Sequence, residues 1–196
     1  QTKPPFTPSL RHYQIGLFEG DAVGSDYGSR VIVVRSSDQG RTWHYQGTVS
    51  HEHEDPHPEL PGMFAGFTES GIAQLDNGQL LCISRSQGSH LPSEYRPLYV
   101  SWSDDGGKTW TQSNSTGWDL FDPHLILAPN GVLAMFHGSY KTGALRVLLS
   151  PDGGRTWHGP GEWLGYSVDP SVYGYCHPIV LPDGTLFGEG VKTRIK

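Results

Sequence analysis

Short apolar runs alternate with turn sequences along the chain, and this alternation predicts β-hairpins. Apolar runs flank an Asn-Gly or Asp-Gly dipeptide at 77–78, 130–131 and 183–184, which is the strongest short-range hairpin signal. Strand-like runs at 30–35, 98–102 and 144–149 each lead into a second kind of turn. The longest stretch without glycine or proline covers only residues 29–39, shorter than the roughly twelve-residue mean helix. The pattern therefore predicts an all-β chain.

The second kind of turn is an eight-residue pattern, Ser-x-Asp-x-Gly-x-Thr-Trp, that occurs three times. Its copies are Ser36–Trp43, Ser103–Trp110 and Ser150–Trp157. In this pattern the aspartate is suited to accept hydrogen bonds from turn amides, the glycine permits positive φ, and the tryptophan can pack under the loop. We therefore expect a folding role for these aspartates and no catalytic one.

Each repeating unit is predicted to contain strand, Asx-Gly turn, strand, loop, strand, eight-residue turn and strand. Four antiparallel strands per unit, at a spacing of roughly 45 residues, are typical of a β-propeller blade. We assign a single domain over residues 1–196, with blades at 6–49, 64–114 and 118–162 and a partial blade at 169–196. About three and a half to four blades leave strand edges at both ends. We expect a homo-oligomer that covers these edges, or a chain shortened from a longer parent.

Composition and charge exclude several classes of partner. The chain has 14 Lys and Arg against 20 Asp and Glu, a formal charge of −6, and no basic run that would follow a nucleic-acid backbone. Its longest apolar runs, near 31–34 and 80–83, fall far short of the ~20 residues of a membrane span. The sequence starts at Gln1 without a positively charged and apolar leader. We expect a secreted, periplasmic or extracellular location and leave a cytoplasmic one open.

The three eight-residue turns resemble the Asp-box motif, and nearly the whole chain is similar to the sialidase (neuraminidase) superfamily, in its bacterial-neuraminidase-repeat branch. The resemblance implies a β-propeller of the six-bladed type and an exo-acting, retaining glycoside hydrolase without a cofactor. The stretch from Glu69 to Arg85 looks like the family's Glu and Arg on either side of a Leu-x-Asp-Gly hairpin. Tyr175 stands where the family has a tyrosine, and Asp26 where it has an aspartate. The resemblance thus implies Tyr175 as nucleophile, assisted by Glu69, and Asp26 as acid/base.

Distances along the hairpins indicate a common rim, because residues equidistant from a turn lie side by side in an antiparallel pair. Glu69, Asp122 and Tyr175 each lie eight residues before the Asn or Asp of their turn. Arg85 and Lys192 stand at matching positions after the turns of Glu69 and Tyr175, and Ser139 is expected opposite Asp122. We therefore expect Glu69, Arg85, Asp122, Tyr175 and Lys192 on one rim.

The sequence departs from the family at the arginines that bind the substrate carboxylate. The family uses three, because a guanidinium binds a carboxylate through two parallel hydrogen bonds. Only Arg85 has a match; the segment 6–10 lacks the first arginine, and Lys141 stands near the third. We expect sialosides to be poor substrates and another sugar to be preferred. The substrate-binding candidates are Arg85, Asp122, His124, Lys141 and Lys192.

Each of these residues also has a structural interpretation. Asp26 can cap a loop, Glu69 can pair with Arg85, and Tyr175 can pack in a core. The run at 51–59 holds several histidines and carboxylates but no fixed spacing, so we interpret it as a solvated loop and expect no metal site. We expect core or loop anchoring, not sugar stacking, from three aromatic residues, Phe64, Trp118 and Tyr173.

Two further alternatives stay open at this point. The propeller can bind glycans without cleaving them, or the chain can be a structural fragment of a larger propeller. For Cys82 and Cys176, both in apolar strand-like contexts, the alternatives are buried free thiols and a single bridge.

Overall fold

The computed structural model describes residues 29–51, 66–86, 97–139, 142, 144–159, 165–169, 172–173, 175–189 and 191–192. All regular secondary structure in these ranges is β-strand, so the all-β prediction is confirmed. The described ranges include no helix with the length and apolar character needed to cross a membrane.

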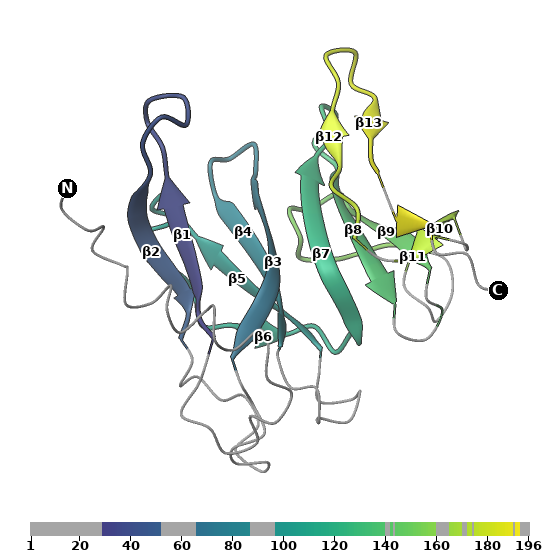
Figure 1. The fold of residues 1–196 in the computed structure, drawn as a ribbon, viewed down its shortest axis with the longest axis horizontal. Coiled ribbons are helices and arrows are strands. Elements are labelled where there is room, and N and C mark those ends of the chain that lie inside the picture. The colour runs from purple at the N-terminus through teal and green to yellow at the C-terminus, as the bar shows by residue number, and fades with distance from the viewer. Residues whose placement is uncertain are drawn as a thin grey trace, which may run out of the picture.

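Two four-stranded antiparallel sheets form the centre of the structure (Figure 1). In each sheet, strands that follow one another in sequence are neighbours. The first consists of β3 (Phe67–Gln74), β4 (Leu80–Ser86), β5 (Leu98–Ser103) and β6 (Asn114–Ser115). The second consists of β7 (Leu120–Leu127), β8 (Leu133–Ser139), β9 (Leu145–Ser150) and β10 (Tyr166–Asp169). β10 lies beyond residue 162, where the sequence analysis places the end of this unit.

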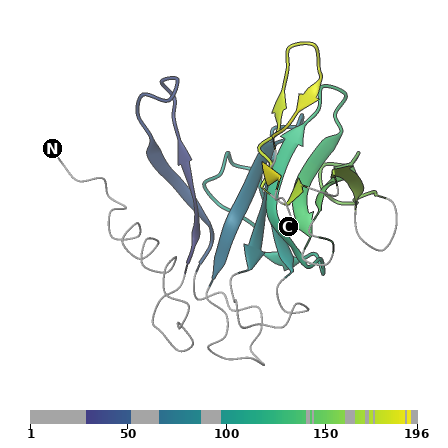
Figure 2. The same cartoon turned by 45° about the vertical axis from the view of Figure 1, so that its right-hand side comes forward.

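Three two-stranded pairs flank these sheets. They are β1 (Val31–Arg35) with β2 (His44–Ser50), β11 (Val172–Tyr173) with β14 (Val191–Lys192), and β12 (Ile179–Val180) with β13 (Leu186–Phe187). Figures 1 and 2 show β1–β2, the sheet of β3–β6 and the sheet of β7–β10 in this order from left to right, with β12–β13 at the top of the view. The first strands β3 and β7 of the two large sheets are in contact. This succession of antiparallel sheets is that of a β-propeller; the number of blades stays a prediction.

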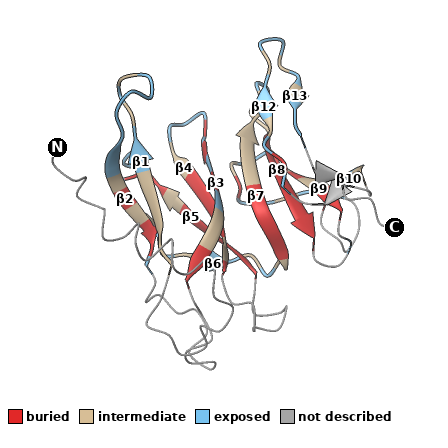
Figure 3. Cartoon of the chain, in the orientation of Figure 1, coloured by how far each residue is buried: buried red, intermediate tan, exposed pale blue. Residues whose placement is uncertain are grey.

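The main core lies between the two four-stranded sheets, as the buried segments of β4, β7 and β8 in Figure 3 illustrate. Its fully buried side chains come from both sheets and include Leu81, Ile83, Leu98, Leu133 and Met135. Burial of such aliphatic side chains contributes about 1.5–3 kcal/mol each. This shared core fixes β3 against β7.

The three Asx-Gly hairpins are built alike. The side-chain oxygen of Asn77, Asn130 or Asp183 accepts a hydrogen bond from the amide two residues later, at 3.0, 3.1 and 2.9 Å. The glycine that follows has φ of 85°, 80° or 85°, a region that side chains disfavour. The hairpins predicted from the dipeptides are therefore present.

The three eight-residue turns also share one hydrogen-bond network. The first serine donates to the aspartate at 2.8–2.9 Å, and the threonine hydroxyl donates to the same carboxylate at 2.6 Å. The tryptophan Nε1 donates to the glycine carbonyl at 3.0–3.1 Å. The hydrogen bonds to the carboxylate, above all those from Thr42, lower the pKa of Asp38 to about 2. In the other two turns, the corresponding bonds from Thr109 and Thr156 lower the pKa of Asp105 and of Asp152. The carboxylates are thus used in folding, as expected.

The eight-residue turns also pack against the preceding sheet. A Cβ on Gly154 would lie 2.4 Å from a methyl of Leu81, and Gln46 donates to the carbonyl of Gly106 at 2.9 Å. The turn at 36–43 has no preceding sheet among the described residues, and its Trp43 is 56% exposed. Trp110 and Trp157, at the equivalent positions, are partly buried.

The turn at 36–43 carries a strained residue that a substitution should relieve. Gln39 has φ of 62°, whereas the other two turns have Gly106 and Gly153 there, both at φ 73°. We expect Gln39→Gly to raise the free energy of unfolding by about 0.5–1 kcal/mol, because the left-handed conformation costs a side-chain-bearing residue more than glycine. Urea denaturation measures this. Ser37→Gly, in the same turn but without positive φ, serves as control and should lower stability; an equal effect of both changes would contradict the expectation.

Cys82 and Cys176 are free thiols, and both are buried. Burial is the main cause that raises the pKa of each to about 11. The structure thus selects the first of the two alternatives left by the sequence. A thiol with so high a pKa is a poor nucleophile at neutral pH.

Candidate functional site

Ahead of three successive Asx-Gly turns, a polar residue has the same unusual backbone conformation. Glu69, Asp122 and Tyr175 have φ of 41°, 50° and 45°, all in the left-handed region. Each lies eight residues before the Asx of its hairpin. At Glu69 and Asp122 the strand pairing shifts register, between Thr68 and Ser70 and between Phe121 and His124. Such bulges turn a side chain out of the regular alternation, and strained residues concentrate at functional sites. We call these three positions the rim residues.

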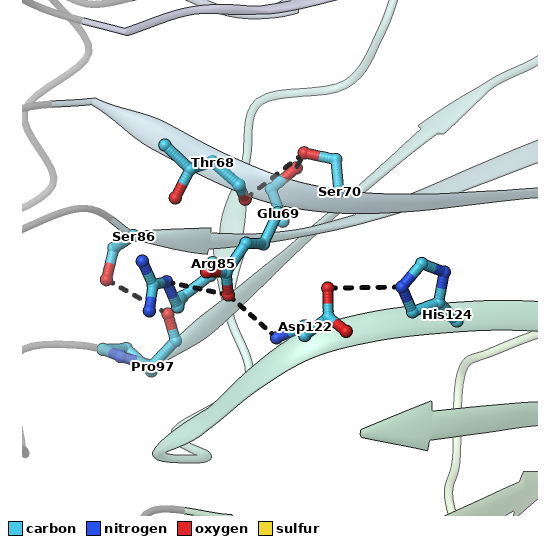
Figure 4. A network of polar contacts seen from close by, with 9 residues as sticks. Thr68, Glu69, Ser70, Arg85, Ser86, Pro97, Asp122 and His124 are labelled. Carbon is cyan, nitrogen blue, oxygen red and sulfur yellow. Dashed lines mark hydrogen bonds and ion pairs between the residues drawn. The ribbon is translucent and has the colours of Figure 1, made fainter. Parts of the chain in front are cut away.

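Glu69 connects two sheets through its carboxylate (Figure 4). Its Oε2 accepts a hydrogen bond from the amide of Asp122 on β7 at 3.0 Å and lies 3.2 Å from Nε of Arg85 on β4. Burial raises the pKa of Glu69 above its usual value, while the Arg85 charge and the Asp122 amide act in the opposite direction. The side chain is therefore held in place and has an increased proton affinity.

Asp122 is only 8% exposed, and its two carboxylate oxygens differ. Oδ1 lies 3.2 Å from Nε2 of His124, on the same strand (Figure 4). Oδ2 is buried and has no hydrogen-bond partner among the described residues. The His124 ring in turn packs edge-on against the ring of His177, with 4.2 Å between the centroids.

Tyr175 is 46% exposed, and its ring lies beside Phe121, with 6.1 Å between centroids. Phe121 is itself held tightly, since a Cβ on its cross-strand partner Gly138 would come within 2.2 Å of the Phe121 ring. Phe121 immediately precedes Asp122. The contacts thus run from Glu69 to Asp122 and from Phe121 to Tyr175, across three successive hairpins.

A family model described as a BNR repeat-like domain matches residues 6–187. The chain belongs to this family. Among curated proteins, a sialidase from Bacteroides fragilis (strain YCH46) is 23% identical over 131 residues, which cover 66% of this chain and 22% of the sialidase. This BNR repeat-like chain thus spans less than a quarter of that relative.

Two solved structures share the fold of this BNR repeat-like chain. A protein of unknown function from Dyadobacter fermentans DSM 18053 has a TM-score of 0.58 at 17% identity, over 93% of this chain and 56% of that one. A family 117 glycoside hydrolase from Zobellia galactanivorans has a TM-score of 0.57 at 17% identity, over 85% of this chain and 49% of the other. At these identities the likeness concerns the fold, and the chain spans about half of each structure.

In this BNR repeat-like chain, two of the expected hairpin pairings differ. Ser139 pairs with Leu120 and not with Asp122, beyond the register shift between Phe121 and His124. An extra residue in one strand shifts every pair beyond it. Lys192 pairs with Val172 and not with Tyr175, in a two-stranded sheet separate from β12–β13, so the expectation of a direct cross-strand neighbour is wrong in both cases. Glu69 and Arg85 remain close because their long side chains bridge the shift.

Several candidate residues lie outside the described part of the structure. Asp26, Lys141 and Phe64 fall in undescribed ranges, and so do all residues of the run 51–59 except His51. The backbones of Tyr173 and Lys192 lie in strands, but their side chains are not described. Within the ranges that are described, no group of three His, Cys, Asp or Glu side chains is arranged to hold a metal ion.

Trp118 packs edge-on against Trp157 at 6.3 Å, in keeping with a core anchor. The sequence analysis did not predict that Phe121 packs beside Tyr175 or that His177 packs beside His124. His177 lies two residues after Tyr175, as His124 does after Asp122, so an alignment of the hairpins on their Asx-Gly turns would have revealed it.

Proposed function

We propose that this propeller is the catalytic region of an exo-acting, retaining glycoside hydrolase. The observation that supports it most is the set of rim residues, which combines a carboxylate of raised pKa with an accessible phenol at equivalent positions two hairpins apart. The relative named as a sialidase supports the same class of reaction. Tyr175 is the proposed nucleophile, Glu69 its proton acceptor and Asp26 the acid/base.

The reaction requires two displacements at the anomeric carbon. In the first, Oη of Tyr175 attacks that carbon, its proton passes to Glu69, and the leaving oxygen departs with a proton from Asp26. In the second, water attacks the same carbon and gives a proton to Asp26, while Oη of Tyr175 leaves and takes its proton back from Glu69. The sum is one glycosidic bond exchanged for one molecule of water, with retained configuration.

The raised pKa of Glu69 suits this part. A phenol with a free pKa near 10 needs a base that gains affinity for the proton as attack proceeds. A desolvated carboxylate is a stronger base than a solvated one, and the Asp122 amide and Arg85 keep its oxygen in a fixed position. The remaining candidates, Arg85, Asp122, His124, Lys141 and Lys192, are proposed as substrate contacts.

A second candidate function is glycan binding without cleavage. The Glu69–Arg85 ion pair favours it, because a structural role alone would explain why the Glu69 carboxylate is held by a guanidinium and a backbone amide. In that case Tyr175 would serve as a platform for a sugar ring, since its phenol is accessible and its ring is held beside Phe121.

A panel of 4-methylumbelliferyl glycosides separates the two functions. We expect the 196-residue chain to release the fluorophore from at least one neutral glycoside and to act poorly on the sialic-acid glycoside, for lack of two arginines of the carboxylate site. Loss of these bidentate hydrogen bonds should lower the affinity for the sialic-acid carboxylate by about a hundredfold or more. Binding on a glycan array without any hydrolysis would favour the second function, and efficient cleavage of the sialoside would contradict the expected substrate preference.

A further inference from the structure

We infer that Asp122 selects the sugar: the site takes a glycone without a carboxylate, and Oδ2 of Asp122 accepts a hydrogen bond from one of its hydroxyl groups. This inference rests on the proposed function, and it concerns the middle one of the three rim residues. It assigns the part that Asp122 plays and the charge class of the substrate.

The first argument is the unsatisfied oxygen. An ionised carboxylate is acceptor-only, and buried polar atoms in folded proteins almost always have a hydrogen-bond partner. Oδ1 of Asp122 lies against His124 Nε2, whereas Oδ2 is buried and has no such partner in the described ranges. A small rotation of the carboxylate would bring Oδ2 within reach of a ligand hydroxyl, which would supply the missing donor.

The second argument is position. Asp122 has the same left-handed backbone conformation and the same distance to its hairpin turn as Glu69 and Tyr175. Its amide is bonded to the Glu69 carboxylate, and its neighbour Phe121 contacts the Tyr175 ring. Asp122 therefore lies between the two proposed catalytic residues in this chain of contacts.

The third argument is charge. Among the described side chains, Arg85 is the arginine or lysine with a printed contact to this set, and its Nε lies 3.2 Å from the Glu69 carboxylate. Asp122 faces an imidazole that is positive only when protonated. Within the described part of the site, two carboxylates thus stand against one permanent positive charge. A glycone carboxylate would meet Asp122 as a like charge in a poorly solvated place, which discriminates against acidic sugars.

The test uses pairs of aryl glycosides that differ only at C6, such as a galactoside and the matching galacturonide, in both anomeric forms. With the unaltered chain we expect kcat/KM at least about tenfold higher for the neutral member of the preferred pair. Asp122→Asn keeps the shape and removes the charge. It should lower kcat/KM for the neutral member about tenfold and reduce the preference for it to near unity or below.

Asp76→Asn is the matched control, because Asp76 is an exposed carboxylate at the turn of the neighbouring β3–β4 hairpin, at the end away from Glu69. It should leave both rates and their ratio unchanged. A preference of the unaltered chain for the acidic member, or an unchanged ratio in Asp122→Asn, would overturn the inference.

Binding distinguishes failure of this inference from failure of the proposed function. If no glycoside is hydrolysed, the proposed hydrolase is wrong, and calorimetric titration with galactose and galacturonic acid still tests Asp122. Tighter binding of galactose that disappears in Asp122→Asn supports the inference. Equal affinities, a preference for the acid, or no binding of either sugar would sink it. Circular dichroism and a melting curve verify that Asp122→Asn is folded.

Discussion

Replacing Tyr175 by phenylalanine is expected to lower kcat/KM for the best aryl glycoside by roughly a thousandfold or more, with the fold unchanged. The substitution removes only the phenolic oxygen that the proposed reaction uses as nucleophile. The ring remains, and so does its contact with Phe121 at 6.1 Å, so the position of the side chain should be preserved. Because the nucleophile is lost and substrate binding is kept, kcat should fall and KM should not rise.

Steady-state kinetics on the purified variant provide the measurement, with the melting temperature as a check of folding. Tyr166→Phe is the matched control: Tyr166 is similarly exposed, at 50% against 46%, but lies on the outer strand β10. It should leave kcat and KM unchanged. Turnover by Tyr175→Phe at the rate of the unaltered chain would show that the phenol is not the nucleophile.

Gly71→Ala is expected to lower the free energy of unfolding by about 3 kcal/mol, a large effect for one added methyl group. Gly71 is buried on β3, and a Cβ there would lie 2.3 Å from the carbonyl oxygen of Pro123 on β7. Because the obstacle is backbone, no side-chain rotation relieves it, and the two sheets must move apart. The same movement would separate Glu69 from the Asp122 amide, so activity should fall as well.

Urea denaturation measures the loss, with Gly78→Ala as control. Gly78 has φ of 85°, but a Cβ there meets no atom within 4 Å, so only the backbone preference is lost, about 1 kcal/mol. The ratio of the two effects separates close packing from conformational preference. A loss in Gly71→Ala no larger than that in Gly78→Ala would mean that the sheets adjust without difficulty.

The sequence predicted the hairpins and eight-residue turns because their determinants are local. An Asn or Asp followed by glycine specifies its own turn, and the Ser, Asp and Thr of each eight-residue turn bond to one another within a few residues. Such patterns need no knowledge of the rest of the chain. They were sufficient for the all-β fold and for the nearness of Glu69 and Arg85.

The bulges could not be predicted in the same way. Nothing in the residues Thr68, Glu69 and Ser70 specifies positive φ, and the bond that Glu69 makes in this conformation is to Asp122, on another sheet. Counting residues from the turn therefore misplaced Ser139. It misplaced Lys192 because β11 and β14 pair in a sheet separate from β12–β13. The close approach of Gly71 to Pro123 is also a contact between distant segments, which a single sequence does not encode visibly.

The recurrence of one left-handed conformation at the three rim residues bears on how such a site evolves. Glycine and asparagine occupy this conformation more readily than glutamate or tyrosine, so mutation alone would drift toward them and gain stability. Under the proposed function, selection on the functional groups of Glu69 and Tyr175 would oppose this drift. Because the backbone presents whatever side chain it carries, a new sugar specificity would then require exchange at a rim position and no new fold.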